Sequence, residues 1–168
     1  MKHFARLFLA GGLVAAAGAA HAQEADFLQS LAGDWSGKGT VMVRTDSSPV
    51  NVTCTFGSNA TDTSLSLDGN CRGLIIVSRA IGADIRAEGA NYSGSYTGAG
   101  TGTAGLNGTR SGNAINLGIS WAKEVNGDRE AQLTVEKVGE NGMTLTTVDT
   151  DPQSGESVVT SQINLTRS

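Results

Sequence analysis

The feature that most constrains this chain is an alternation of apolar and polar residues that recurs along most of its length. It is clearest from Trp35 to Val43, where every second residue is apolar or glycine and most of the residues between them are polar. Similar short runs, separated by turn residues, follow to the end of the chain. A period of two places successive side chains on opposite faces of a β-strand. The sequence therefore predicts an all-β protein.

About ten such runs occur at intervals near ten residues, which is typical of a β-sandwich or a β-barrel. Strict alternation in most of them favours an antiparallel meander that closes into a barrel of about 8–10 strands. Before the first strand, the apolar spacing of residues 24–32 predicts a short helical turn that ends at Gly33. The last strand is expected to carry these residues on one face: Val159, Ile163, Leu165 and Arg167.

Residues 1–22 have the features of a secretory signal peptide. A basic start with Lys2 and Arg6 is followed by an apolar and small-residue run over residues 7–20, and Ala20-His21-Ala22 fits an A-x-A cleavage site. We therefore expect cleavage near Ala22 and a periplasmic or secreted protein. Residues 23–168 are then expected to form a single barrel domain.

Removal of the signal peptide would change the available chemistry. Both histidines lie within it, and ten of the twelve basic residues would remain against sixteen acidic ones, a net charge of −6. That charge disfavours nucleic acid and anionic lipid surfaces. With no histidine to activate a serine, and with the cysteines expected to be oxidised, we expect no enzymatic activity. Neither a metal site nor a cofactor is expected, because two thiols without histidine do not complete a zinc site.

Cys54 and Cys71 are the two cysteines of the chain, and in an exported protein such a pair is expected to form a disulfide. Asp68-Gly69 is a strong hairpin signal. A reversal there, however, would separate the cysteines by two strand spacings, roughly 9–10 Å, which exceeds disulfide reach. A turn at residues 59–62 instead places them opposite each other. We therefore expect one bent strand over residues 63–78.

The run that begins Leu-Ala-Gly-Asp-Trp-Ser-Gly-Lys-Gly at Leu31 resembles the first strand of barrels in the calycin group. This group comprises lipocalins, fatty-acid-binding proteins, avidins and nitrobindin-like proteins. In lipocalins a G-x-W motif opens the first strand and an arginine near the end of the barrel packs over the tryptophan. The resemblance assigns these roles to Gly33, Trp35 and Arg167. It implies a barrel that holds a small apolar ligand. Haem bound through a histidine, as in nitrobindin-like proteins, is excluded because residues 23–168 contain none.

Three further motifs have simpler structural interpretations. The segment Gly100–Gly105 matches G-x-G-x-x-G, but a strand-like run follows it where a dinucleotide site needs a helix. Asp149-Thr-Asp151 lacks the spacing of an EF-hand loop and is interpreted as part of a hairpin loop. Asp84, Arg86 and Glu88 alternate on one side of a strand, which is typical of a solvent-facing row.

The alternation also identifies residues expected to line the interior. Whether these side chains fill a packed core or border a cavity remains open, as does the role of the glycine-dense stretch 89–112. The leading hypothesis is a non-catalytic barrel that carries a small apolar molecule such as a lipid fragment. The alternative is an envelope-maintenance or inhibitor-type barrel with a basic protein partner. The candidate lining residues are Trp35, Val41, Val43, Phe56, Leu117, Ile119 and Trp121.

Overall fold

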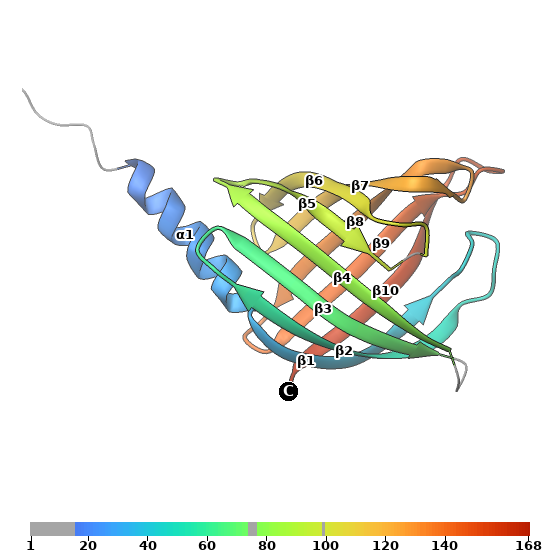
Figure 1. Ribbon diagram of the computed structural model, residues 1–168, viewed down its shortest axis with the longest axis horizontal. Helices are drawn as coiled ribbons and strands as arrows, with labels where there is room; N and C mark the ends of the chain where they lie inside the picture. Colours follow the sequence, from blue (N-terminus) through green and yellow to red (C-terminus); the bar gives the residue numbers. More distant parts are fainter. Residues whose placement is uncertain (1–15, 74–76, 99) are drawn as a thin grey trace, which may run out of the picture.

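A computed structural model describes residues 16–73, 77–98 and 100–168. These residues form one helix and ten strands, and the strands close into an antiparallel barrel in which each strand pairs with its neighbours in sequence and β1 pairs with β10 (Figure 1). The predicted fold class is thus confirmed. The elements are α1 (Ala16–Leu31), β1 (Gly33–Val41), β2 (Val50–Ala60), β3 (Ser64–Gly73), β4 (Val77–Glu88), β5 (Asn91–Thr97), β6 (Ala104–Ser111), β7 (Ala114–Val125), β8 (Asp128–Val138), β9 (Gly142–Thr150) and β10 (Ser157–Arg167).

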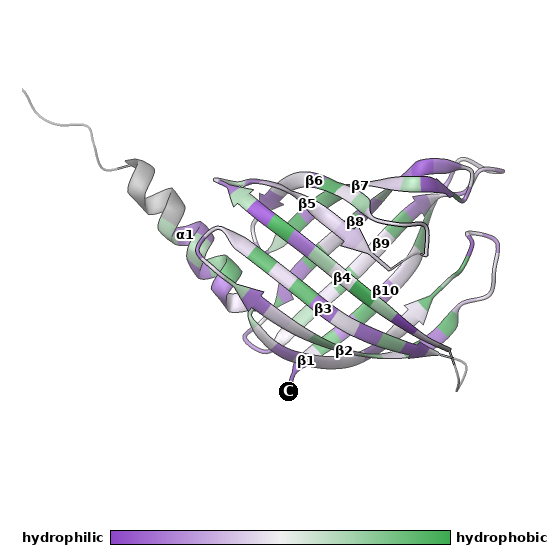
Figure 2. Ribbon diagram, viewed as in Figure 1, coloured by the Kyte–Doolittle hydropathy of each residue, from purple (hydrophilic) through white to green (hydrophobic). Residues whose placement is uncertain are grey.

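The period of two in the sequence becomes the inner and outer faces of the barrel. Apolar and polar residues alternate along the strands in Figure 2. On β7 every second residue from Ile115 to Trp121 is buried, whereas the residues between them, such as Asn116 and Ser120, are exposed. Burial of the apolar face drives this arrangement, while the polar face remains hydrated.

The two ends of the barrel differ in their connections. At one end, four turns of two or three residues link β2 to β3, β4 to β5, β6 to β7 and β8 to β9, and α1 lies across this end (Figure 1). We call it the closed end. At the opposite end, the connections β1–β2, β5–β6 and β9–β10 are six to eight residues long. We call this the open end.

Helix α1 seals the closed end with apolar side chains and one buried ion pair. Leu28 and Leu31 are fully buried. The Glu24 carboxylate accepts a hydrogen bond from the Tyr92 hydroxyl and another, of 2.9 Å, from Nε of Arg110. An interior carboxylate needs such partners to offset its lost hydration. The helix is therefore joined to β5 and β6 as well as to the core.

The helix is longer than the predicted turn, because it begins at Ala16 rather than near Glu24. The expected cleavage position at Ala22 lies within it, and the buried residues Glu24, Leu28 and Leu31 follow that position. Residues 1–15 of the expected signal peptide lie outside the described residues. Within the described part of the chain, no helix is both long and apolar enough to cross a membrane.

Cys54 and Cys71 are direct cross-strand partners on β2 and β3, and they form the predicted disulfide. The turn between these strands follows Ala60, as the disulfide argument required. The prediction of one strand over residues 63–78 is wrong. Strand β3 ends at Gly73 and β4 begins at Val77 with reversed direction. The sequence did not distinguish the faces of the apolar segment 74–77, and its residues 74–76 lie outside the described residues.

Strand β10 departs from simple alternation at one point. Its pairing with β9 shifts register between Val159 and Ser161. A β-bulge of this kind adds one residue and reverses the faces beyond it. Val159 is consequently 49% exposed, whereas Thr160 is buried, so the prediction that Val159 shares a face with Ile163 is wrong.

The disulfide should contribute a large share of the stability of this barrel. It closes a loop with a sequence separation of 17 residues, for which the loss of chain entropy in the unfolded state predicts about 3 kcal/mol. We expect the double variant Cys54→Ala/Cys71→Ala to lose about that much free energy of unfolding in a urea titration. An unchanged urea midpoint would show that the cross-link adds no stability.

Candidate functional site

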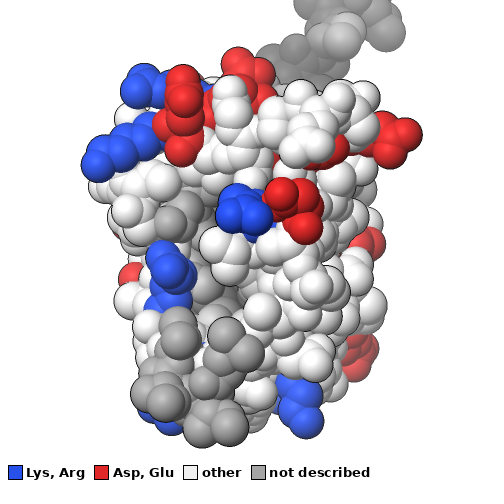
Figure 3. Space-filling model, turned by 90° about the vertical axis from the view of Figure 1, so that its right-hand side faces the viewer, with Lys and Arg blue, Asp and Glu red and all other residues white. Residues whose placement is uncertain are grey.

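A cavity of about 280 Å3 opens at the open end of the barrel. Figure 3 views the molecule onto this end, where acidic and basic side chains are interspersed and most of the surface is uncharged. The aliphatic lining comes from β1, β2, β4, β7 and the β1–β2 connection, and includes Val41, Val43, Val50, Val52, Ile81 and Val125. Side chains of β4, β5, β7 and β9 add Arg79, Tyr96, Trp121 and Asp149.

Differences in side-chain size explain why this half of the barrel is hollow. Toward the closed end, large buried side chains such as Trp35 and Phe56 face each other across β1 and β2 and fill the interior. Toward the open end, the corresponding cross-strand row is Gly39, Val52 and Gly73. A ten-stranded barrel needs large inward side chains to fill it. Small residues in this row leave volume unoccupied.

The glycine-dense stretch contributes to both wall shape and cavity. A methyl group added at Gly94 would lie 2.0 Å from the carbonyl oxygen of Asp84, so glycine there permits close approach of β5 to β4. Gly98 lines the cavity. The G-x-G-x-x-G segment begins in the β5–β6 connection and its last residues, Ala104 and Gly105, open strand β6, so the segment leads into a strand and not into the helix that a dinucleotide site needs.

Asp149 is a buried carboxylate on the cavity wall, with only 4% of its surface exposed. One of its oxygens accepts a 2.6 Å hydrogen bond from the Asn126 side-chain amide, and the other accepts a 2.8 Å bond from the backbone N–H of Thr150. These partners satisfy the carboxylate from within the protein. Among the described residues, no group of three or more His, Cys, Asp or Glu side chains is placed to hold a metal ion.

The opposite wall carries donors that lack acceptors. Arg79 lies beside Cys71 in the β3–β4 register and therefore shares its inward face. Within the described residues, the guanidinium donates to one acceptor, the carbonyl oxygen of Gly98, at 3.2 Å. The buried indole N–H of Trp121 has no hydrogen-bond partner there. The Tyr96 ring meets the Trp121 ring edge-on, with centroids 5.8 Å apart.

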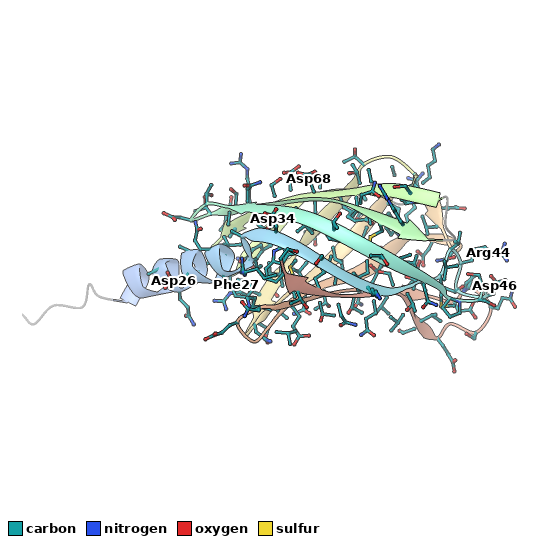
Figure 4. The ribbon with its side chains drawn as sticks, turned by 90° about the horizontal axis from the view of Figure 1, so that it is seen from below. Asp26, Phe27, Asp34, Arg44, Asp46 and Asp68 are labelled. Carbon is teal, nitrogen blue, oxygen red and sulfur yellow. A yellow bond between two sulfur atoms is a disulfide. The ribbon has the colours of Figure 1, made fainter. Side chains whose placement is uncertain are left out.

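The β1–β2 connection is fixed across the open end by Thr45. Its backbone N–H donates to the side-chain oxygen of Asn126 at 3.3 Å, and its hydroxyl donates to Asp151 at 3.1 Å. Hydrogen bonds from Ser154, with a smaller one from Thr45, lower the pKa of Asp151. Next to Thr45, Arg44 and Asp46 form an exposed ion pair at the same end (Figure 4). Three connections are thereby tied together at the rim of the cavity.

The expected lining residues divide between the cavity and the packed core. Val41, Val43 and Trp121 line the cavity, and Val43 is 78% exposed at its rim. The other expected lining residues belong to the buried core: Trp35, Phe56, Leu117 and Ile119. Sequence reasoning missed Arg79 and Tyr96. The parity of Tyr96 with Tyr92 and Gly94 could have indicated its inward face.

Gly33, Trp35 and Arg167 lie together at the closed end, far along the barrel from the cavity. The Arg167 guanidinium stacks 4.4 Å from the centre of the Trp35 ring. A methyl group at Gly33 would lie 2.4 Å from a nitrogen of Arg167, and Gly33 has a φ of +123°, so glycine suits this position on two grounds.

The same arginine and tryptophan cap the C-terminal end of α1. Arg167 donates to the carbonyl oxygens of Ala32 and, at 2.8 Å, of Ser30. The Trp35 indole donates to the carbonyl oxygen of Leu31 at 3.0 Å. The last carbonyl groups of a helix have no partner within it, so these contacts join α1 to both β1 and β10.

Comparison with known proteins yields a similarity of fold. No protein-family model and no curated protein matches the sequence. The structure is similar to the crystal structure of Rv2717c from M. tuberculosis, with a TM-score of 0.65 and 13% sequence identity. The alignment covers 84% of this chain and 97% of that one.

Both tyrosines of the chain lie in surroundings that favour the neutral phenol. Burial raises the pKa of Tyr96. Burial, followed by the hydrogen bond to Glu24, raises the pKa of Tyr92. An unfolded tyrosine ionises near pH 10. The buried phenols therefore contribute stability that is fully present below about pH 10 and is lost as the pH rises through the folded pKa values.

We expect the native protein to form little tyrosinate at about pH 10, where an unfolded chain would be half ionised. The near-ultraviolet absorbance of tyrosinate measures this directly, and Tyr92→Phe isolates the signal of Tyr96. The free energy of unfolding should fall above about pH 10. Native ionisation of Tyr96 with an ordinary pKa would contradict its enclosure by the cavity wall.

Proposed function

We propose that this protein is a non-catalytic binding protein that holds a small apolar ligand in the cavity at the open end. The observation that carries the proposal is the cavity itself, of about 280 Å3 and lined largely by aliphatic and aromatic side chains. Pockets of this kind, with a few polar groups that orient the ligand, are typical small-molecule sites. Transfer of an apolar molecule from water to such a lining is favourable.

The rest of the barrel supports a carrier with a single entrance. The interior toward the closed end is occupied by a continuous apolar core, and α1 covers that end. A bound molecule would therefore enter and leave through the open end. There the β1–β2 connection, held by Thr45, borders the opening.

We further propose a periplasmic or secreted location. The disulfide between Cys54 and Cys71 fits an oxidising compartment. The signal-like features of residues 1–22 provide independent support from the sequence. Cleavage near Ala22 would leave the barrel contacts of Glu24, Leu28 and Leu31 intact.

The alternative role, with a basic protein partner, has less support from the structure. It was inferred from the net charge of −6 expected for residues 23–168. A docking site for such a partner would be expected to concentrate acidic side chains. At the open end, acidic and basic side chains are interspersed instead (Figure 3). We therefore favour a small-molecule ligand at this end.

Filling the cavity should block binding of an uncharged fluorescent probe, N-phenyl-1-naphthylamine. Val52 lines the cavity, and its neighbour Thr53 is exposed on the outer face of the same strand. We expect Val52→Phe to weaken probe binding about tenfold, because overpacking costs about 1–3 kcal/mol and a tenfold change corresponds to about 1.4 kcal/mol. Thr53→Phe, which adds the same ring outside the barrel, should bind as the parent does.

Equal binding by the two variants, or no binding by the parent, would contradict the proposal. Native mass spectrometry of protein purified from the periplasm provides a second test. A discrete additional mass that organic extraction removes would identify a carried molecule. A bare chain that also fails to bind the probe would direct attention to a protein partner.

A further inference from the structure

The polar groups around the cavity are not balanced between donors and acceptors. The acceptor side is satisfied, because Asp149 already receives hydrogen bonds from Asn126 and Thr150. The donor groups can still donate further hydrogen bonds. A guanidinium has five N–H donors, and Arg79 has one acceptor among the described residues, the carbonyl of Gly98. The cavity therefore offers a ligand more donors than acceptors.

Gly98 brings two of these donors together. Arg79 donates to its carbonyl, and a methyl group added at Gly98 would lie 2.7 Å from the Tyr96 hydroxyl oxygen. The Tyr96 hydroxyl makes no side-chain hydrogen bond within the described residues. Its ring packs against Trp121, whose buried N–H also lacks an acceptor. Donors from β4, β5 and β7 are thus grouped on one wall.

Arg79 lies where it can act on a ligand without being buried itself. It lines the cavity yet remains exposed to solvent, and it faces inward beside the disulfide residue Cys71. Among the described lining residues, Arg79 is the cation. The anion, Asp149, lies on β9, across the barrel from β4. The aliphatic side chain of Ile81 lines the cavity from β4, the strand of Arg79, and those of Val50 and Val52 line it from β2. A polar head at Arg79 would leave these for an apolar tail.

We propose that the ligand is an amphiphile with a carboxylate head, and that Arg79 and the Tyr96 hydroxyl bind this head at the rim of the cavity. A carboxylate matches the planar guanidinium with two parallel hydrogen bonds and accepts a further bond from a hydroxyl. This inference rests on the proposed function, because it assigns the chemistry of the ligand in the same cavity.

The test compares two competitors with the same alkyl tail, decanoate and decanol, as displacers of N-phenyl-1-naphthylamine. We expect the parent protein to bind decanoate about tenfold more tightly than decanol, as a charge-assisted hydrogen bond predicts. In Arg79→Gln that preference should disappear while the probe still binds. Arg72→Gln is the matched control, because Arg72 is an exposed cation on the outer face of neighbouring β3.

The outcomes separate this inference from the proposed function. Probe binding with no preference for decanoate, or with a preference that survives Arg79→Gln, overturns the assignment of the head group and leaves an apolar cavity ligand. Failure of the parent to bind the probe overturns the proposed function itself. If Arg79→Gln does not fold by circular dichroism, Tyr96→Phe replaces it. That variant keeps the ring and should reduce the preference without abolishing it.

Discussion

The pairing of β1 with β10 is the constraint on which the rest of the structure depends. It runs in register from Trp35 opposite Arg167 to Val41 opposite Ser161, and it converts an open ten-stranded meander into a barrel without edges. Two glycines of β1 allow the backbones of β1 and β10 to approach each other closely. Methyl groups at Gly37 and Gly39 would lie 1.9 and 2.0 Å from carbonyl oxygens of β10. The same pairing places Arg167 over Trp35 and so joins the first strand, the last strand and α1.

The closed barrel has an interior with two different halves. At the closed end, aromatic and leucine side chains pack against the buried face of α1, and the core is continuous. Beyond the disulfide the inward positions are smaller, and a cavity replaces the core. The packed half supplies the stability that a barrel with an unfilled half needs. Cys71 belongs to both halves, because it is buried in the core cluster and also borders the cavity.

Sequence reasoning succeeded where one physical signal acted alone. Alternation predicted the strands and their inward faces, and the reach of a disulfide selected the correct hairpin between Cys54 and Cys71. It failed where alternation was interrupted. The apolar residues 74–76 concealed the reversal between β3 and β4, and the bulge after Val159 exchanged the faces of β10. Gly73 directly precedes the reversal, but the apolar run after it continued the strand pattern, and the bulge after Val159 has no adjacent glycine or proline.

Prediction of the cavity residues from the sequence was limited in the same way. Val41, Val43 and Trp121 were expected to face inward from parity alone. Arg79 was not found, because its inward position follows from its pairing with Cys71, and that pairing exists only after the chain reverses at the open end. Alternation also identifies which side chains point inward without giving the space between them. The division between core and cavity therefore required the three-dimensional arrangement.

The placement of the chain termini has a consequence for how the protein can be held. Helix α1 leads into β1 at the closed end, and the C-terminus leaves β10 at that same end (Figure 1). Attachment at the C-terminus or at α1, to a surface, a tag or another domain, would hold the molecule by its closed end. The mouth of the cavity would then point away from the attachment, with the loops at its rim unobstructed.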